Sequence, residues 1–525
     1  MIIKNELARI GLLLFTILLF SCNDNKSSGV PTANEKYRPQ FHFTPQANWM
    51  NDPNGMVYYE GEYHLFYQYY PDSTVWGPMH WGHAVSKDLI HWEHLPIALY
   101  PDSLGYIYSG SAVIDWENTT GFGSKENPPM VAIYTYHNME AERAGANNFE
   151  TQALAYSLDK GRTWKKYKNN PVLPNPELKH FRDPKVIWHE ESEQWIMILA
   201  AGDRVKFYAS KDLKLWSFKS DFMRDTVAQG GGWECPDLFP LKLEGSDITK
   251  WIILVSINPG GPNGGSATQY FVGDFDGSSF QPDVDTAKWL DWGMDNYAGV
   301  TWSDIPEEDG RRLFIGWMSN WQYAQEVPTE SWRSAMTLPR ELKLVQEKDD
   351  IIIVSNPIKE FNVLKEQHQM DYETLLSGEV PIDIKELDLN SCELNFVFEP
   401  QEASQNGHTT AFGLLLRNDE EEELKLGYNM LSKKFFMDRT NVCKAFSNPQ
   451  YLSLITGDYT IQKQVKMKII IDASSIEVFV DDGKFVMTNT IFPQDPFNQL
   501  SLFSSLGSVK IREAEFFNIK NNKTK

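Results

Sequence analysis

The stretch Ser86-Lys-Asp-Leu-Ile-His-Trp92 occurs in two further versions in the chain, Ser157-Leu-Asp-Lys-Gly-Arg-Thr-Trp164 and Ser210-Lys-Asp-Leu-Lys-Leu-Trp216. In each version the Ser-x-Asp sequence predicts a turn, because short polar side chains bond to nearby backbone amides. The Trp that closes each version is expected to anchor the strand that follows. Recurrence of one element at intervals of tens of residues is typical of a repeat fold, in which the same small sheet is built several times.

Pairs of short apolar or alternating runs surround these elements, and helical periodicity is nearly absent up to about residue 345. The runs predict hairpins at residues 56–70, 184–200 and 238–257. The innermost strands of five repeats are expected near Asp52, Ser109, Asp183, Glu234 and Tyr297. We therefore predict an all-β fold with a five-bladed β-propeller at residues 37–345. The alternative is a β-sandwich in which the similarity among the three elements is fortuitous.

The character of the sequence changes after residue 345. Residues 346–378 are predicted to form a linker with room for a short helix, and residues 379–525 a C-terminal β-sandwich. Asp482-Gly483 is a hairpin signal between two of its expected strands. This part of the chain has no comparable cluster of acids with Pro and Trp, so its expected role is structural or ancillary sugar binding.

The composition indicates a packed globular protein and excludes several kinds of partner. Of the 525 residues, 13% are aromatic, whereas disordered chains are poor in aromatic residues. The formal net charge of −22 repels phosphate, so nucleic acid is not expected as a partner, whereas a neutral sugar is compatible with it. Four cysteines without CxxC or His/Cys spacing predict neither a structural zinc site nor a disulfide scaffold.

The first residues predict a targeting signal rather than a part of the fold. Lys4 and Arg9 precede an apolar run at residues 10–20, about half the roughly 20 residues that span a bilayer. The run ends in Leu19-Phe-Ser-Cys22, which resembles the bacterial lipobox, whose Cys is lipidated. We therefore expect a lipoprotein signal peptide at residues 1–21, a lipid on Cys22 and a flexible tether at residues 22–36. The alternative is an ordinary signal peptide with an incidental Cys.

Three acids occupy equivalent places in the predicted repeats. They lie in Asn51-Asp-Pro-Asn-Gly55, Arg182-Asp-Pro184 and Glu234-Cys-Pro236. Each acid stands directly before a Pro or is separated from it by one residue, and each is expected just before the first strand of a repeat. Equivalent positions in radial repeats lie near one another, so these carboxylates are expected to meet in one central cavity. Pro restricts the residue before it to an extended conformation, which is expected to hold the acids in place. The alternative is that the Asp residues only cap turns.

Converging carboxylates without a metal cluster suit the hydrolysis of a glycosidic bond. One acid protonates the leaving oxygen, while a second carboxylate attacks the anomeric carbon or activates water. Crowding separates the pKa values of like charges, as these two tasks require. Tryptophans flank the acids in sequence and suit stacking on a sugar face. They are Trp49, Trp76, Trp81, Trp233 and Trp317.

At these residues the sequence resembles glycoside hydrolase family 32, the β-fructofuranosidases. Residues 48–55 resemble the family's nucleophile motif, residues 182–184 match its second motif and residues 234–236 its third. Tyr108-Ser-Gly-Ser111 resembles a Phe-Ser-Gly-Ser element, with Tyr in place of Phe. Further similar stretches are residues 76–83, 317–321, 332–341 and 474–479. The resemblance covers nearly all of the expected mature chain.

This resemblance implies a five-bladed propeller with a C-terminal sandwich, retention of configuration, and a role for each acid. Asp52 corresponds to the nucleophile and Glu234 to the general acid and base, while Asp183 corresponds to a residue that stabilises the transition state by holding fructose hydroxyls. Arg182 is expected to lower the pKa of neighbouring acids. Cys235 is expected to be a packed thiol. The positions that match the fructose site are Asn51, Gln68, Trp76, Tyr108, Ser109, Arg182 and Trp317. No metal or cofactor is implied.

The stretch 316–341 most resembles the exo-acting bacterial fructanases, so we expect release of terminal fructose from levan, inulin or fructo-oligosaccharides, with sucrose as a further candidate. An endo-acting levanase or inulinase, an invertase and a fructosyl transferase remain as alternatives. In a different class, the chain would be a non-catalytic glycan-binding lipoprotein, which loss of a reacting acid would favour; all three acids are present. The expected location is the bacterial cell envelope, with the membrane as a partner through the lipid on Cys22.

Overall fold

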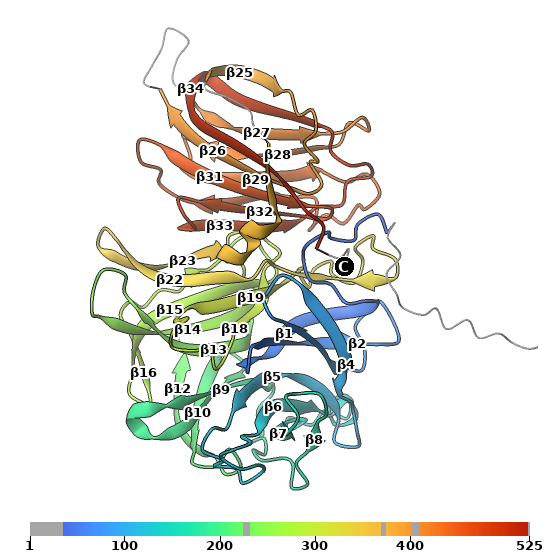
Figure 1. Cartoon of the computed structure of the whole chain (residues 1–525), viewed down its shortest axis with the longest axis vertical. Coiled ribbons are helices and arrows are strands. Elements are labelled where there is room, and N and C mark those ends of the chain that lie inside the picture. The colour runs from blue at the N-terminus through green and yellow to red at the C-terminus, as the bar shows by residue number, and fades with distance from the viewer. Residues whose placement is uncertain (1–34, 224–230, 369–373, 402–408, 523–525) are drawn as a thin grey trace, which may run out of the picture.

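A computed structural model of the chain describes residues 35–223, 231–368, 374–401 and 409–522. Two β-rich bodies are stacked along the long axis, the N-terminal one below the C-terminal one in Figure 1. The predicted signal peptide, Cys22 and most of the predicted tether lie outside the described residues. None of the helices in the described ranges is long and apolar enough to cross a bilayer.

Five sheets form the N-terminal body, so the prediction of a five-bladed propeller is confirmed. The first two are β1 (Asn48–Tyr59), β2 (Glu62–Tyr70), β3 (His80–Ser86) and β4 (Trp92–Leu99), then β5 (Tyr106–Ile114), β6 (Met130–His137), β7 (Glu150–Ser157) and β8 (Lys165–Lys166). The third is β9 (Phe181–His189), β10 (Gln194–Ala201), β11 (Arg204–Ser210) and β12 (Ser217–Met223). The fourth is β13 (Gly232–Lys242), β14 (Thr249–Asn258), β15 (Ala267–Phe275), β16 (Phe280–Pro282) and β17 (Lys288–Trp289). The fifth is β18 (Tyr297–Thr301), β19 (Arg312–Met318), β21 (Ala335–Met336), β22 (Arg340–Glu347) and β23 (Asp350–Pro357).

The predicted turn element is present in three blades. In the first, Asp88 accepts hydrogen bonds from the backbone amides of Ile90 and His91, and Trp92 Nε1 donates to the carbonyl of Leu89. Trp164 Nε1 and Trp216 Nε1 make the same bond to a carbonyl three residues earlier. Each Trp therefore fastens its turn to the strand that follows, as the sequence predicts.

The ring of blades is closed by a strand from late in the propeller. The innermost strands contact one another in the cyclic order β1, β5, β9, β13 and β18. The short strand β20 (Trp332–Arg333) then pairs in parallel with the start of β1, and the amide of Asn48 donates to the carbonyl of Ser331 at 2.7 Å. The segment between β19 and β21 of the fifth blade thus holds the start of the first blade.

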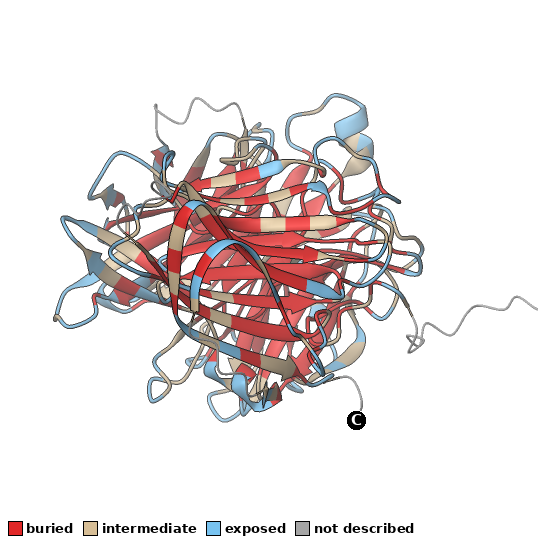
Figure 2. Ribbon diagram, turned by 90° about the horizontal axis from the view of Figure 1, so that it is seen from above, coloured by how far each residue is buried: buried red, intermediate tan, exposed pale blue. Residues whose placement is uncertain are grey.

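The C-terminal body is the predicted β-sandwich, and buried hydrophobic side chains of its strands form its core (Figure 2). Its strands are β24 (Lys365–His368), β25 (Thr374–Ile382), β26 (Cys392–Pro400), β27 (Ala411–Arg417), β28 (Glu423–Asn429), β29 (Lys434–Asn441), β30 (Leu454–Asp458), β31 (Val465–Asp472), β32 (Ser475–Val480), β33 (Phe485–Thr490) and β34 (Gln499–Ile519). The long strand β34 pairs with β24, β25, β26 and β27, and so joins the two halves of the sandwich.

The stretch 346–378 differs from the predicted linker. It contains β23, which pairs along its length with β22 as the outer strand of the fifth blade. A 3-10 helix at Lys359–Leu364 follows, and β24 and the start of β25 already belong to the sandwich. The sequence did not show this because the pairing of β23 depends on a neighbouring blade strand. The other described helices are α1 (Met139–Arg143) and a 3-10 turn at Glu190–Ser192.

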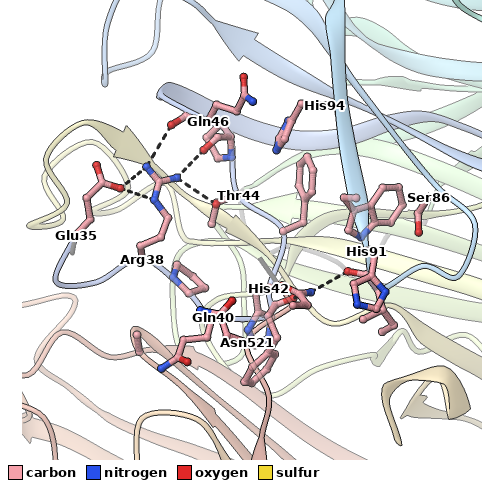
Figure 3. A pocket seen from close by; sticks show the side chains of 18 of the residues that line it. Glu35, Arg38, Gln40, His42, Thr44, Gln46, Ser86, His91, His94 and Asn521 are labelled. Carbon is pink, nitrogen blue, oxygen red and sulfur yellow. Dashed lines mark hydrogen bonds and ion pairs between the residues drawn. The ribbon is translucent and has the colours of Figure 1, made fainter. Parts of the chain in front are cut away.

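Buried charges hold the two bodies together. His42, which precedes the first blade, is 1% exposed, and its ring nitrogens lie 2.8 Å from Asp472 and 2.8 Å from Glu477 of the sandwich. Arg340 of the fifth blade also donates to Glu477. A groove of about 1100 Å³ opens beside this contact, and Figure 3 shows His42 and His91 among its lining side chains. Burial alone would lower the pKa of His42, but the two carboxylates outweigh it and raise that pKa to about 9.

The contact predicts a pH-dependent contribution of His42 to stability. Its raised pKa means that the contribution is complete below pH 6.5 and is lost as the pH rises through about 9. We expect His42→Asn to lower the free energy of unfolding by about 3 kcal/mol more at pH 6 than at pH 10, as measured by urea denaturation. The matched control is His91→Asn, because His91 is 40% exposed and faces one carboxylate, that of Asp88. It should cost less than about 1 kcal/mol at either pH, and equal losses for His42→Asn at both pH values would contradict the prediction.

Candidate active site

The three acids lie inside innermost strands and not before them, which corrects the expectation from the sequence. Asp52 lies in β1, Asp183 in β9 and Glu234 in β13. In all three strands the pairing register shifts next to the acid. β5 and β18 shift in the same way, beside Ser109 and Ala298. A bulge of this kind changes the direction in which a side chain points. Each of the five innermost strands therefore has one irregular residue at an equivalent position.

The backbone before Pro184 and before Pro236 also differs from the predicted extended conformation. Asp183 has a φ of 62° and Cys235 a φ of 46°, so neither residue is extended although each precedes a Pro. Left-handed geometry at a residue other than Gly costs free energy and persists only where the surroundings enforce it. Here the bulge and the hydrogen bonds of the site enforce it, and the local preference set by the Pro is overridden.

Cys235 joins the acids across the ring. Its amide donates to Asp183 Oδ2 at 3.0 Å, and its Sγ lies 3.5 Å from Asp52 Oδ2 and 3.6 Å from Asp183 Oδ2. Burial raises the pKa of the thiol well above its usual range, and the surrounding carboxylates raise it further. Cys235 is therefore a protonated, packed thiol between two carboxylates that are 131 residues apart in the chain.

Asp52 is held by a short chain of hydrogen bonds. Trp49 Nε1 donates to Asn51 Oδ1 at 2.7 Å, Asn51 Nδ2 donates to Asp52 Oδ1 at 2.9 Å, and Ser109 Oγ donates to Asp52 Oδ2 at 2.9 Å. Burial and then the charge of Glu234 raise the pKa of Asp52, whereas the bonds from Asn51 and Ser109 lower it. Both carboxylate oxygens are thus fixed in direction by donors from two different blades.

Glu234 is held from both sides and remains accessible. Arg182 Nη2 donates to Glu234 Oε1 at 2.5 Å, and the hydroxyl of Tyr297 donates to Glu234 Oε2. The side chain of Glu234 is 21% exposed, so a ligand can reach it. Burial and the charge of Glu234 raise the pKa of Tyr297 well above its usual range, and Tyr297 therefore stays protonated and acts as the donor.

Asp183 is the most buried of the three acids, at 6% exposure. Burial raises its pKa to about 7, although Arg182 pulls the pKa down; Glu234 and Asp52 raise it further. Its carboxylate accepts from the amide of Cys235, and its own amide donates to Thr135 Oγ1 at 3.1 Å. Asp183 is therefore an acid whose raised pKa is set first by burial and then by the charges around it.

The remaining predicted site residues fall into two groups. Gln68 Nε2 and Trp317 Nε1 are buried donors for which no partner is found among the described residues, and buried donors are normally satisfied by protein, water or a ligand. Trp76 and Tyr108 are half-buried, with ring centroids 6.3 Å apart. By contrast, Trp81 donates to the carbonyl of Tyr108, and Trp233 packs in the core of the third and fourth blades, so the expected sugar contact does not apply to these two rings.

Sequence reasoning missed two partners of Arg182 and Glu234. Glu150, which is fully buried on β7, accepts from Arg182 Nη1 at 3.0 Å. Tyr297 was recognised only as the start of a strand, although its position in the fifth repeat matches that of the acids. That equivalence was the signal that could have identified it. In the described part of the chain, no group of three or more His, Cys, Asp or Glu side chains has the arrangement of a metal site.

Comparison with known proteins gives two family matches that together cover most of the chain. Residues 42–357 match the N-terminal domain of glycosyl hydrolases family 32, and residues 359–518 match the C-terminal domain of the same family. The two matches meet at the short 3-10 helix between the propeller and the sandwich.

Individual relatives agree with this assignment. The chain is 46% identical to a levanase of Bacillus subtilis over 97% of this chain and 74% of the relative, and 38% identical to an extracellular exo-inulinase of Aspergillus niger over 92% and 95%. The crystal structure of exo-inulinase from Aspergillus awamori aligns with a TM-score of 0.85 at 36% identity, covering 94% of this chain and all of that one. A fructofuranosidase variant from Schwanniomyces occidentalis, complexed with fructosylnystose, aligns with a TM-score of 0.82 at 32% identity, covering 93% and 98%.

The raised pKa of Asp183 predicts that this acid destabilises the fold at neutral pH. In the unfolded chain the Asp183 carboxyl group ionises near pH 3.8, whereas in the folded protein it retains its proton up to about pH 7. The destabilisation therefore grows as the pH rises between these two values. We expect Asp183→Asn to resist urea better than the unsubstituted protein at pH 8, by up to about 4 kcal/mol, and to lose this advantage at pH 4.

The matched control for this measurement is Asp115→Asn. Asp115 is fully buried and accepts four hydrogen bonds from Thr119 and Thr120. An amide nitrogen in place of one of these oxygens leaves buried donors unpaired, so this variant should be less stable at pH 8. A loss of stability in Asp183→Asn at pH 8 would show that its charge is compensated in the fold.

Proposed function

Because the chain belongs to glycosyl hydrolase family 32 and is a glycosidase of the fructan-hydrolysing kind, we propose that it releases terminal fructose from β-fructans through a covalent fructosyl–enzyme intermediate. The observation that carries this proposal is the contact of Cys235 with both Asp52 and Asp183, beside Glu234 on the same strand. It supports the proposal because the two proposed reacting acids, Asp52 and Glu234, and the third acid, Asp183, all lie around this one residue.

Asp52 is the proposed nucleophile. Its two oxygens are oriented by Asn51 and Ser109, and it has no cationic partner among the described residues that would hold its charge in place. In the first step a carboxylate oxygen of Asp52 bonds to the anomeric carbon of fructose while the bond to the leaving oxygen breaks. The product is a fructosyl ester of Asp52 and a chain shortened by one residue.

Glu234 is the proposed general acid and base. It gives a proton to the leaving oxygen in the first step and takes a proton from the attacking water in the second, which frees Asp52 and fructose. Arg182 and Tyr297 each hold one of its oxygens, so the carboxyl group cannot rotate away between the two steps. Its partial exposure fits a group that must meet both the leaving oxygen and water.

Asp183, Gln68 and Trp317 are the proposed holders of the fructose hydroxyl groups. The carboxylate of Asp183 is an acceptor, and the unpaired Gln68 Nε2 and Trp317 Nε1 are donors. Buried polar groups without a protein partner cost stability unless a ligand satisfies them, so their presence supports a hydroxyl-rich ligand. Trp76 and Tyr108, which are half-buried, supply apolar contact to the sugar.

Exo action on levan or inulin is the proposed specificity, supported by the similarity to a levanase and to exo-inulinases. Endo action and sucrose cleavage are the alternatives. Incubation with levan and inulin in the presence of methanol distinguishes the outcomes, because methanol intercepts the ester on Asp52. We expect fructose and methyl β-fructofuranoside as the small products, without a ladder of oligosaccharides, as read by chromatography and NMR.

Two variants accompany this measurement. Asp52→Asn cannot form the ester and should lower kcat at least about 10⁴-fold, since the nucleophile is lost. Trp81→Phe removes one hydrogen bond to a carbonyl and part of a buried ring but no group proposed to touch the sugar, so kcat should stay within about tenfold of that of the unsubstituted enzyme. A methyl α-fructofuranoside product would contradict double displacement, and an oligosaccharide ladder would contradict exo action.

A lipid anchor at Cys22 is a further part of the proposal. The lipobox resemblance at residues 19–22 supports it, as does the polar stretch between Cys22 and the first described residues. Expressed with its leader in a bacterium, the protein should label with radioactive palmitate and sediment with membranes. Cys22→Ala should abolish the label and leave the enzyme in the soluble fraction. Labelling of the Cys22→Ala variant would exclude this residue as the lipid site.

A further inference from the structure

Tyr297 reaches Glu234 from the start of β18, and the segment that leads into β18 lies on the sandwich. In this segment, residues 291–296, the amide of Trp292 donates to the carbonyl of Val486 at 2.8 Å, and that of Asp295 to the carbonyl of Thr488 at 3.0 Å. Both acceptors belong to β33. The lead-in segment is therefore paired to a strand of the other domain immediately before it delivers Tyr297 to the site.

The two backbones approach so closely that only glycine fits at the centre of the contact. A Cβ atom on Gly293 would lie 2.1 Å from the carbonyl oxygen of Thr488 and 2.3 Å from its nitrogen. Such distances are far below van der Waals contact, and the atoms met are backbone atoms that cannot turn aside. The register of the lead-in segment on β33 is thus fixed by shape as well as by hydrogen bonds.

A buried ion pair secures the end of the segment nearest to Tyr297. Asp295 is fully buried and accepts from the amide of Thr490 at 2.8 Å, from Thr490 Oγ1 at 3.1 Å and from Arg439 Nη1 at 2.8 Å. Arg439 comes from β29 of the sandwich and is also fully buried. A buried carboxylate that loses its cation is strongly unfavourable, so this pair holds Asp295 in one place.

The same ion pair reaches a second wall of the site. Tyr323 Oη donates to Asp295 Oδ1 at 2.7 Å, and Arg439 Nη2 donates to the Tyr323 hydroxyl at 3.1 Å. Tyr323 belongs to the loop that carries Trp321, whose ring stacks on Trp49 with centroids 5.8 Å apart. Trp49 in turn bonds to Asn51, the neighbour of Asp52. One guanidinium of the sandwich thus fixes the segment that bonds to Glu234 and a second segment that reaches Asp52 only through Trp49 and Asn51.

We propose that Arg439 is a positioning residue for Glu234, acting through Asp295 and two residues of backbone to hold the hydroxyl of Tyr297 against the carboxyl group. The inference rests on the proposed role of Glu234 and extends it to a residue of the other domain. Without the guanidinium, Asp295 must rearrange or bind water, and the start of β18 moves with it. A small displacement of Tyr297 is enough to break its hydrogen bond and release Glu234, and misplacement by about 1 Å can cost about 10²-fold in rate.

The test compares two substrates that differ in their need for an acid. The trisaccharide 1-kestose requires protonation of its leaving oxygen, whereas β-fructosyl fluoride loses fluoride without it. For Arg439→Met we expect kcat/KM on 1-kestose to fall about 10- to 100-fold, with kcat/KM on the fluoride within about threefold of the unsubstituted enzyme. Thr490→Val, which removes one hydroxyl and nearly preserves shape, should shift the ratio in the same direction by about threefold or more.

A double-mutant cycle shows whether the effect passes through Tyr297. Tyr297→Phe should itself produce the difference between substrates, and Arg439→Met should add no further difference in the Tyr297→Phe background. Leu414→Ala is the control for general loss of stability, because it truncates a fully buried side chain of the same sandwich on β27. It should lower the melting temperature while leaving the ratio of the two kcat/KM values unchanged.

Glu234→Gln separates failure of this inference from failure of the proposed function. If Glu234→Gln shows no difference between the substrates, Glu234 is not the acid and the proposed function is wrong at that point. If Glu234→Gln shows the difference but Thr490→Val and soluble Arg439→Met do not, the positioning role of Arg439 is overturned. An additive effect of Arg439→Met and Tyr297→Phe would likewise overturn it, and where Arg439→Met does not fold, the cycle with Thr490→Val decides.

Discussion

Four carboxylates share one guanidinium at the centre of the propeller, and most features of the site follow from this imbalance. Arg182 contacts Glu150 and Glu234 directly and lies 3.9 Å from Asp183, while Asp52 forms no ion pair within the described ranges of the chain. The negative charge that Arg182 does not neutralise must be held by hydrogen bonds or by protons. Accordingly, Asn51 and Ser109 bond to Asp52, the pKa of Asp183 is raised to about 7, and Tyr297 and the Cys235 thiol remain protonated. The acids therefore have unequal surroundings, as the proposed division of roles between Asp52 and Glu234 requires.

A second set of buried charges lies between the domains and follows a simple rule. Asp291 and Asp295 each accept from the amide and the hydroxyl of a threonine on β33, and each also accepts from a buried arginine. The repeated pattern clamps the lead-in of the fifth blade to the sandwich. Because His42 and Arg340 meet Glu477 close by, the seam resembles a protein core with compensated charges rather than a loose contact between domains. The C-terminal domain is thereby part of the framework of the site.

Several features of the fold could be predicted because they depend on neighbours in the chain. The Ser-x-Asp turns close their hydrogen bonds within four residues, and Asp482-Gly483 turns the chain between β32 and β33. The five innermost strands are predictable because each carries a recognisable residue, although that residue lies inside the strand in four of the five. The fate of residues 350–357 was missed, since pairing with β22 and not local composition makes them a blade strand. The burial of Trp81 and Trp233 was missed for the same reason, as a Trp in sequence does not reveal which side it faces.

The amino-acid sequence by itself determined the repeat and the two all-β domains and singled out the three acids proposed for the site, because alternation, turn chemistry and motif spacing are local properties. Tertiary structure alone decided how those acids are presented. The bulges, the positive φ of Asp183 and Cys235 before prolines, and the bond from Tyr297 to Glu234 arise where five strands crowd around one axis. The link from Arg439 to the lead-in of β18 arises instead where the fifth blade meets the sandwich, and it joins residues 144 positions apart. Such contacts depend on packing between distant segments, and packing overrode the local preference wherever the two disagreed.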